Sequence, residues 1–153
     1  MLIEGEWYQT DEVATRPVLR GEVRNYDGGW TAVEFLIDTC ADITIFSAAT
    51  YSHSGFPDTD ESSVIKGVGG QVSTTPLTPT LRFRSAHGTE AERTGPYVAV
   101  KDQKSLDMSL LGQDVLDVFQ LVVDRPGRLI LLLAAPDTYR IELSSLDAGH
   151  AQS

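Results

Sequence analysis

The feature that most constrains the fold of this chain is the short interval between its chain breakers. Gly, Pro, Asn and Asp interrupt the apolar stretches every few residues, and long stretches with the 3.6-residue period of a helix are scarce. Short apolar runs bounded by turn formers are typical of strands. The pattern therefore predicts an all-β fold, and the length of 153 residues predicts a single domain with its own core.

Individual elements follow from the same pattern. The clearest strand runs from Thr31 to Ile37, where apolar side chains alternate between two faces. A strand at 17–24 precedes it, and the connecting segment 25–29 has the Asn, Asp and Gly residues that tight turns need. Residues 47–63 are polar and predict a loop that begins with at most one helical turn. The other expected elements are a glycine-tipped hairpin at 64–72, strands at 77–84 and 97–100, a hairpin of 121–123 with 129–133, and one short helix at 113–119.

The charge balance narrows the choice of partner and compartment. Twelve Lys and Arg against 22 Asp and Glu leave a formal net charge of −10, which would repel phosphate backbones and anionic lipid. We therefore expect neither nucleic acid nor a membrane as a partner. The single cysteine, Cys40, excludes an internal disulfide, and the chain has no apolar run long enough to span a bilayer. A soluble, cytoplasmic protein of a reducing compartment is expected.

One carboxylate occupies an unusual place in this pattern. Asp38 follows the apolar residues 35–37 and precedes the small residues 39–41. A carboxylate at the end of an apolar strand is poorly solvated, which costs free energy unless the group is protonated, paired or functional. A carboxylate that merely caps a turn is the structural alternative.

Three separated motifs resemble the retropepsin-like aspartic protease family. Residues 38–42, Asp-Thr-Cys-Ala-Asp, are similar to its catalytic turn, in which an apolar strand is followed by Asp-Thr-Gly-Ala. Residues 67–70 are similar to the tip of its flap, and residues 110–116 to the apolar-Gly-Arg-Asp/Asn segment that opens its C-terminal helix. The resemblance spans about residues 16–133. It implies a closed, retropepsin-like β-barrel at 16–143, with one short C-terminal helix, between an N-terminal extension (1–15) and a flexible tail (144–153).

The resemblance also implies an aspartic endopeptidase without a metal or cofactor. Such hydrolysis needs one carboxylate to take a proton from water and one carboxylic acid to bond the carbonyl oxygen, so two aspartates must share a proton. This chain has one suitable turn, since Asp58-Thr59 and Asp137-Thr138 each follow a proline. The second Asp38 must come from another copy. We therefore expect a homodimer that cleaves an extended peptide or unfolded protein.

Further roles follow from the resemblance, residue by residue. Thr39 would hydrogen-bond the partner subunit's turn and fix the catalytic Asp38 pair. Ala41 would leave space for the substrate backbone, and Asp42 would bind that backbone or anchor the dimer by pairing with Arg16 of the partner subunit. The hairpin tip would close over substrate and the start of the helix would support the turn: Gly67, Val68, Gly69 and Gly70 for the first, Gly112 and Asp114 for the second.

Two residues depart from the family pattern and keep other functions open. Cys40 stands where the family has glycine, so its side chain would crowd the aspartates or form a disulfide between subunits. Gln113 stands where the family usually has arginine, which removes an ion pair with Asp42 and predicts a looser turn or dimer, a loss that Arg16 partly offsets. A catalytically silent peptide-binding or dimerisation module is the first alternative. An unrelated small β-barrel binding domain is the second.

Other chemistries fit the sequence less well. A nucleophilic Cys40 would need a histidine nearby, yet His53, His87 and His150 lie in polar loops or the tail. Because the histidines are far apart in the sequence, no two potential ligands have the spacing of a zinc site. The acidic run at 58–61 lacks the glycine-centred pattern of a calcium loop.

Overall fold

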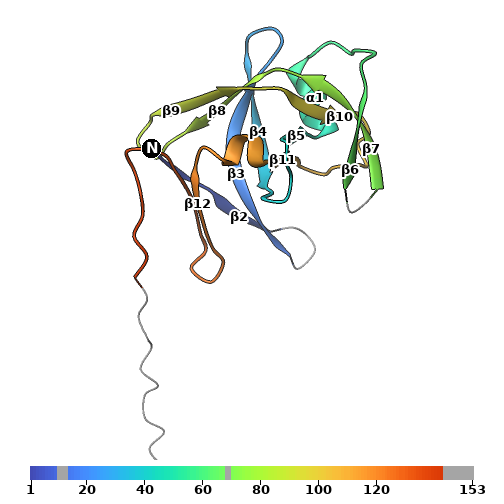
Figure 1. Cartoon of the computed structure of the whole chain (residues 1–153). Coiled ribbons are helices and arrows are strands. Elements are labelled where there is room, and N and C mark those ends of the chain that lie inside the picture. The colour runs from blue at the N-terminus through green and yellow to red at the C-terminus, as the bar shows by residue number, and fades with distance from the viewer. Residues whose placement is uncertain (10–13, 68–69, 143–153) are drawn as a thin grey trace, which may run out of the picture.

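The computed structural model describes residues 1–9, 14–67 and 70–142. Within these ranges the chain forms thirteen strands and two short helices (Figure 1), which confirms the mostly β prediction. The expected tail at 144–153, Val68 and Gly69 lie outside the described residues. No helix in the described ranges is both long and apolar enough to cross a membrane.

The elements have the following bounds. The first half of the chain contains β1 (Leu2–Glu4), β2 (Glu6–Gln9), β3 (Thr15–Arg24), β4 (Trp30–Ile37), β5 (Ile45–Phe46), α1 (Ala48–Ser54), β6 (Ser63–Gly67) and β7 (Gly70–Leu77). The second half contains β8 (Thr80–Arg84), β9 (Glu90–Thr94), β10 (Tyr97–Val100), β11 (Ser109–Leu111), α2 (Gln113–Leu116), β12 (Gln120–Asp124) and β13 (Leu129–Leu133).

The strands form two hydrogen-bonded sheets. The larger has the order β6-β7-β10-β5-β11-β4-β3-β8-β9, with β2 paired to β3 off this path, and the smaller has the order β1-β13-β12. Among the described residues the larger sheet ends at β6 and β9, so hydrogen bonds do not close the expected barrel. The β6–β7 hairpin lies on the opposite side of the molecule from β12 (Figure 1).

The core brings together aromatic side chains from several strands. Phe35 on β4 contacts Phe46 on β5 and Phe83 on β8, with ring centroids 6.0 and 6.1 Å apart, and Phe46 contacts Tyr97 on β10 at 5.9 Å. All four side chains are buried. Tilted and edge-on ring pairs of this kind add attraction to apolar burial. The aromatic contacts thus fix β4 and β5, the two strands that flank the predicted catalytic turn.

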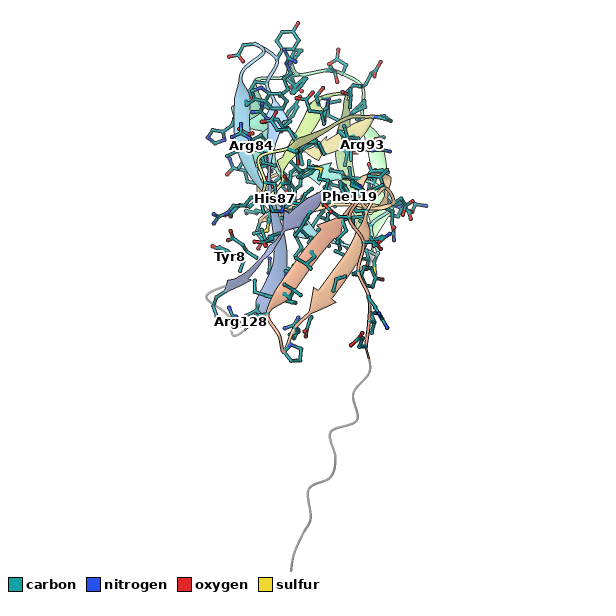
Figure 2. All side chains as sticks on the ribbon, turned by 90° about the vertical axis from the view of Figure 1, so that its left-hand side faces the viewer. Tyr8, Arg84, His87, Arg93, Phe119 and Arg128 are labelled. Atoms are coloured by element: carbon teal, nitrogen blue, oxygen red, sulfur yellow. The ribbon has the colours of Figure 1, made fainter. Side chains whose placement is uncertain are left out.

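The first nine residues are part of the fold. The sequence sets residues 1–15 apart as an extension, but β1 pairs with β13 and β2 pairs with β3. Ile3 is buried in the core, and the amide of Gly5 donates to the Ile130 carbonyl oxygen at 2.9 Å. Figure 2 shows this side of the molecule, with β2, where Tyr8 is labelled, beside the β12–β13 hairpin and its Arg128.

The structure adds one helix to the single helix expected. Residues 48–54, expected as a loop after at most one helical turn, form α1. The Ser47 hydroxyl caps its start by accepting from the Thr50 amide at 3.3 Å, and Gly55 ends it in the left-handed conformation. The helix is too short and polar to show a 3.6-residue apolar pattern, so packing against β4 and β10 stabilises it rather than its own sequence.

Prolines shift two strand boundaries. The strand expected at 77–84 is divided: β7 continues to Leu77, Pro79 lies in the break, and β8 begins at Thr80. Pro76 is tolerated in β7 because the pairing of β7 with β6 has already ended at Thr74.

The second helix is shorter than predicted. A helix is expected at 113–119, but α2 ends at Leu116.

Candidate active site

The sheet topology places the Asp38 turn against the start of α2. Strands β4 and β5 are consecutive in the sequence, but β11 lies between them and pairs with both, Leu110 being opposite Leu36 and Ile45. The connecting residues 38–44 must therefore pass over the end of β11. For this reason the residues that follow β11 meet the predicted catalytic turn, although about 70 residues separate them in the chain.

Backbone hydrogen bonds hold the two segments together. Three of them link residues 38–42 to residues 111–114: Asp38 N to Leu111 O at 3.1 Å, Gln113 N to Ala41 O at 2.8 Å, and Asp114 N to Asp42 O at 3.2 Å. The donors Gln113 and Asp114 are the first residues of α2, whose amides have no partner inside the helix. The turn thus satisfies the helix start while the helix start fixes the turn.

Asp38 itself is held by its own turn. Its Oδ1 atom accepts from the Cys40 amide at 2.9 Å, and its side chain is half-buried. Thr39, Cys40 and Asp42 are exposed, and the Cys40 thiol is free. A carboxylate fixed by a backbone donor at a partly open edge is oriented and still accessible to a water or a second carboxyl group.

A buried side-chain network supports the turn from below. Thr44 is fully buried, and its hydroxyl donates to Asp114 Oδ1 at 2.7 Å and accepts from the Gly112 amide at 3.1 Å. The Thr44 amide donates to Asp114 Oδ2 at 3.0 Å. Hydrogen bonds to a carboxylate are stronger than neutral ones, so Asp114 holds Thr44 at the end of the segment that contains the turn. The sequence did not single out Thr44, although a hydroxyl directly before the apolar pair Ile45-Phe46 was the available sign.

Gly112 is required by the close approach of the two segments. A Cβ atom on this residue would lie 2.5 Å from the Ile43 carbonyl oxygen and 2.9 Å from the Ala41 carbonyl oxygen. These neighbours are backbone atoms of the turn and cannot rotate away. Glycine therefore lets β11 and the turn pack in contact, which gives a physical reason for the glycine of the third motif.

Gln113 lies beside the Asp38 turn. Its Nε2 donates to the Thr39 carbonyl oxygen at 2.6 Å, so the residue expected to leave the turn looser makes a direct contact with it. Arg16 is used elsewhere within the chain, where its guanidinium pairs with Asp107 at 2.7 Å. The expected pairing of Arg16 with Asp42 of another subunit stays a prediction.

Burial and a nearby charge change the titration of one side chain of the site. Tyr97 packs on Phe46 and donates through its hydroxyl to the Arg93 carbonyl oxygen at 3.2 Å. Burial, reinforced by the negative charge of Asp114, raises the pKa of Tyr97 to about 12. The phenol is therefore a neutral hydrogen-bond donor at all ordinary pH values.

A groove of about 530 Å³ lies between the β6–β7 hairpin and β11. Gly67 and Gly70 of the hairpin line it, whereas its other lining residues are mostly aliphatic: Ile45, Ile65, Val72, Thr74, Val100, Lys104, Ser105, Leu106 and Leu110. We call this cavity the hairpin groove. Leu110 contributes its side chain to the groove, and the next residue, Leu111, holds Asp38 through its carbonyl oxygen. The groove is therefore adjacent to the Asp38 turn.

Sequence reasoning missed most of these lining residues. Lys104 and Leu106 belong to the connection between β10 and β11, whose sequence has no strand or helix pattern. The isolated apolar Leu106 gave no indication that the connection folds back over the groove. Among the described residues, no three His, Cys, Asp or Glu side chains cluster in a way that could hold a metal ion.

The comparisons with known proteins agree with this geometry. Residues 22–115 match the model of a family described as aspartyl protease. A retropepsin-like aspartic protease from Rickettsia conorii superposes with a TM-score of 0.56 at 19% sequence identity, covering 86% of this chain and 88% of that one. The EIAV protease in complex with the inhibitor HBY-793 has 21% identity and a TM-score of 0.47, covering 71% of this chain and 92% of that one. A comparison with curated proteins finds no match.

The family match covers the predicted site and most of the larger sheet. The matched residues 22–115 are more than half of the chain, and they include the Asp38 turn, the β6–β7 hairpin and Gly112. The likeness to the Rickettsia structure independently shows that the fold is of the retropepsin type. This chain therefore belongs to the aspartyl protease family.

Proposed function

We propose that this protein is an aspartic endopeptidase that acts as a homodimer through a pair of Asp38 carboxylates. Membership of the aspartyl protease family supports a protease function in general terms. The observation that carries the specific proposal is the junction at β11. There Leu111 fixes Asp38 while Leu110 lines an apolar groove under a glycine-rich hairpin. One edge of the protein thus combines an oriented carboxylate with a place for a peptide.

The proposed reaction needs both Asp38 residues of a dimer. One carboxylate takes a proton from a water molecule, whose oxygen then attacks the peptide carbonyl carbon, while the other, protonated Asp38 donates a hydrogen bond to the carbonyl oxygen. The tetrahedral intermediate collapses when the Asp38 that took the proton from water passes it to the amide nitrogen and the C–N bond breaks, which leaves one proton on the pair again. The products are a carboxylic acid and an amine. Because two carboxylates in contact cannot both carry a charge, the pair holds one proton between them.

A two-fold dimer is the arrangement that supplies the second carboxylate. The described residues contain one Asp-Thr turn that follows an apolar strand, and a C2 axis beside Asp38 would bring its symmetry mate to the same place. Thr39, exposed next to Asp38, would bond the partner's turn. Asp42 would contact the substrate or pair with Arg16 of the partner subunit.

The β6–β7 hairpin would act as the flap over the substrate. It occupies one end of the larger sheet, and its inner residues Ile65 and Val72 line the hairpin groove. An extended peptide in this groove would place alternate side chains against the aliphatic floor and exchange backbone hydrogen bonds with the flanking strands. Closure of the hairpin would exclude water from the reacting bond.

The test compares Asp38→Asn with Asp137→Asn. Both variants change an Asp-Thr pair by the same chemical step, but Asp137 lies outside the turn, where it pairs with the N-terminal ammonium group of Met1 at 2.6 Å. We expect Asp38→Asn to abolish cleavage of an unfolded protein at mildly acidic pH while size and circular dichroism stay unchanged. Asp137→Asn should cleave at close to the wild-type rate. Equal cleavage by wild type and Asp38→Asn would refute the proposal.

A catalytically silent peptide-binding module remains the second candidate, because Cys40 occupies the glycine position of the turn. The Cys40 side chain is exposed beside Asp38, where a symmetry mate would approach. Under this alternative, wild type binds peptides without cleaving them, and Cys40→Gly gains cleavage. Cleavage by the wild-type protein that depends on Asp38 excludes it.

A further inference from the structure

The hairpin groove carries a single positive charge at its edge. Of the described residues that line it, Lys104 is the charged one, and the others are aliphatic or small and polar. Its side chain is exposed. A long aliphatic stem lets lysine pack along an apolar surface while its ammonium group stays in water. Lys104 therefore presents a cation next to whatever side chain occupies the groove.

The turn that carries Lys104 is anchored at both ends. Lys101 pairs with Asp58 before it, and Asp107 pairs with Arg16 at 2.7 Å after it. Within the turn, Asp102 Oδ1 accepts from the Lys104 amide at 3.0 Å, and the Asp102 carbonyl accepts from the Ser105 amide at 3.1 Å. The position of Lys104 on the groove is therefore fixed by the fold.

The ammonium group of Lys104 makes no ion pair with the described residues. The neighbouring Lys101 shows the contrast, because its ammonium group is taken up by Asp58. The carboxylate closest in sequence to Lys104 is Asp102, and it is used by backbone and hydroxyl donors of its own turn. A cation without a partner at the edge of an apolar groove is suited to a ligand that brings the missing carboxylate.

The size of the groove indicates where that carboxylate would lie on a peptide. A cavity of about 530 Å³ is in the range that holds a small ligand rather than one side chain. In an extended peptide, side chains two residues apart point to the same face. One apolar side chain and a second side chain two residues away can therefore share the groove, with the second ending beside Lys104.

We infer that Lys104 makes the protein selective for peptides that carry Glu or Asp two residues from an apolar side chain seated in the hairpin groove. The inference rests on the proposed function, because it assumes that peptides bind in this groove. The net charge of −10 repels acidic peptides as a whole. The selectivity must therefore be confined to one peptide position, and added salt must weaken it.

The experiment uses matched peptides in which a single Glu or Gln is moved along one apolar sequence. For wild type we expect one position at which the Glu peptide has a kcat/KM about 3–10 times that of the Gln peptide, as a partly shielded ion pair would give. Lys104→Met should reduce this ratio to about one, and Lys104→Glu should reverse it. Lys66→Met is the matched control: Lys66 is exposed on β6 and does not line the groove, so the ratio should persist.

A binding measurement separates this inference from the proposed function. The Asp38→Asn variant keeps the groove, so the affinities of the same Glu and Gln peptides can be measured on it by fluorescence anisotropy without hydrolysis. If wild type does not cleave any peptide but binding still favours Glu in a way that depends on Lys104, the proposed endopeptidase function is refuted and the inference about Lys104 is supported. Equal affinities at every position, or a preference that survives Lys104→Met, would overturn the inference whether or not the protein cleaves peptides.

Discussion

The β6–β7 hairpin lines the hairpin groove and the Asp38 turn lies next to that groove, but the two segments are built in opposite ways. Backbone hydrogen bonds from residues 111–114 and the buried Thr44–Asp114 network hold the turn. The hairpin is mostly exposed, and Val64 keeps 59% of its surface open to solvent. Local stability follows burial and contact density. A carboxylate held by hydrogen bonds thus lies close to a hairpin that is mostly exposed.

Glycine illustrates the difference between the two regions. Gly112 is glycine because backbone atoms of Ile43 and Ala41 fill the space of a side chain. Gly67 in the hairpin has no neighbouring atom within 4 Å of an added Cβ. The same residue type therefore serves close packing under the turn and leaves open space at the hairpin.

The largest effect on stability is expected for Gly112→Ala, and Gly67→Ala is its comparison variant. Gly112→Ala forces a methyl group against backbone, so we expect a loss of about 3 kcal/mol or more in the free energy of unfolding. Gly67→Ala should change it by less than about 0.5 kcal/mol. Urea denaturation measures both values. Similar losses for the two variants would contradict the contrast between the regions.

The buried network predicts the next largest effect. Thr44→Val keeps the side-chain shape but leaves the Gly112 amide without its acceptor and removes one donor to Asp114. We expect a loss of about 2 kcal/mol in the free energy of unfolding. Thr80→Val is the control, because Thr80 bonds Thr94 at an exposed position; its effect should stay below about 0.5 kcal/mol. If Thr44→Val were as mild as the control, the network would not be what holds the turn.

Tyr97 gives a pH-dependent test of burial beside the turn. Its pKa in the folded chain is raised to about 12 from the ordinary value of 10.0 for tyrosine, so the folded state binds its proton more tightly than the unfolded state does. The associated stability is complete below pH 10 and is lost as the pH rises toward 12. Between pH 9 and 11 we expect a decrease of about 1.4 kcal/mol. In Tyr97→Phe the free energy of unfolding should not show this decrease. Urea denaturation of both proteins at the two pH values measures the difference.

The smallest effect concerns Gln113. Gln113→Ala removes the hydrogen bond to the Thr39 carbonyl oxygen at an accessible position, so a loss of about 0.5–1 kcal/mol is expected. Chemical denaturation provides the stability value, and cleavage assays show whether the turn has moved. A decrease in stability as large as that of Thr44→Val would mean that Gln113 is a main support of the turn rather than a minor one.

The sequence predicted the elements whose patterns are local. The alternation at 31–37, the glycine-tipped hairpin and the strand at 97–100 all appear with boundaries close to those expected. Gly112 and Asp114 could be singled out together with the turn because each lies within a short motif, and the structure brings these segments into contact. The mostly β architecture followed from the spacing of turn formers alone.

The parts that the sequence did not predict depend on contacts between distant segments. Strand β9 is the polar run Glu90–Thr94, which shows no apolar alternation because it lies at the sheet edge. The role of Thr44 becomes visible only when β11 is inserted between β4 and β5. Lys104 reaches the groove because ion pairs at both ends of its connection fix the turn, and no local pattern encodes such an arrangement.

The most direct test of the central claim counts how many Asp38 carboxylates one active site needs. Wild-type and Asp38→Asn chains are mixed in equal amounts, unfolded and refolded together, and cleavage is compared with that of wild type at the same total concentration. If two Asp38 residues from different chains form each site, random pairing leaves about one quarter of the activity. Retention of about one half would mean that each chain works alone, and it would contradict the shared pair.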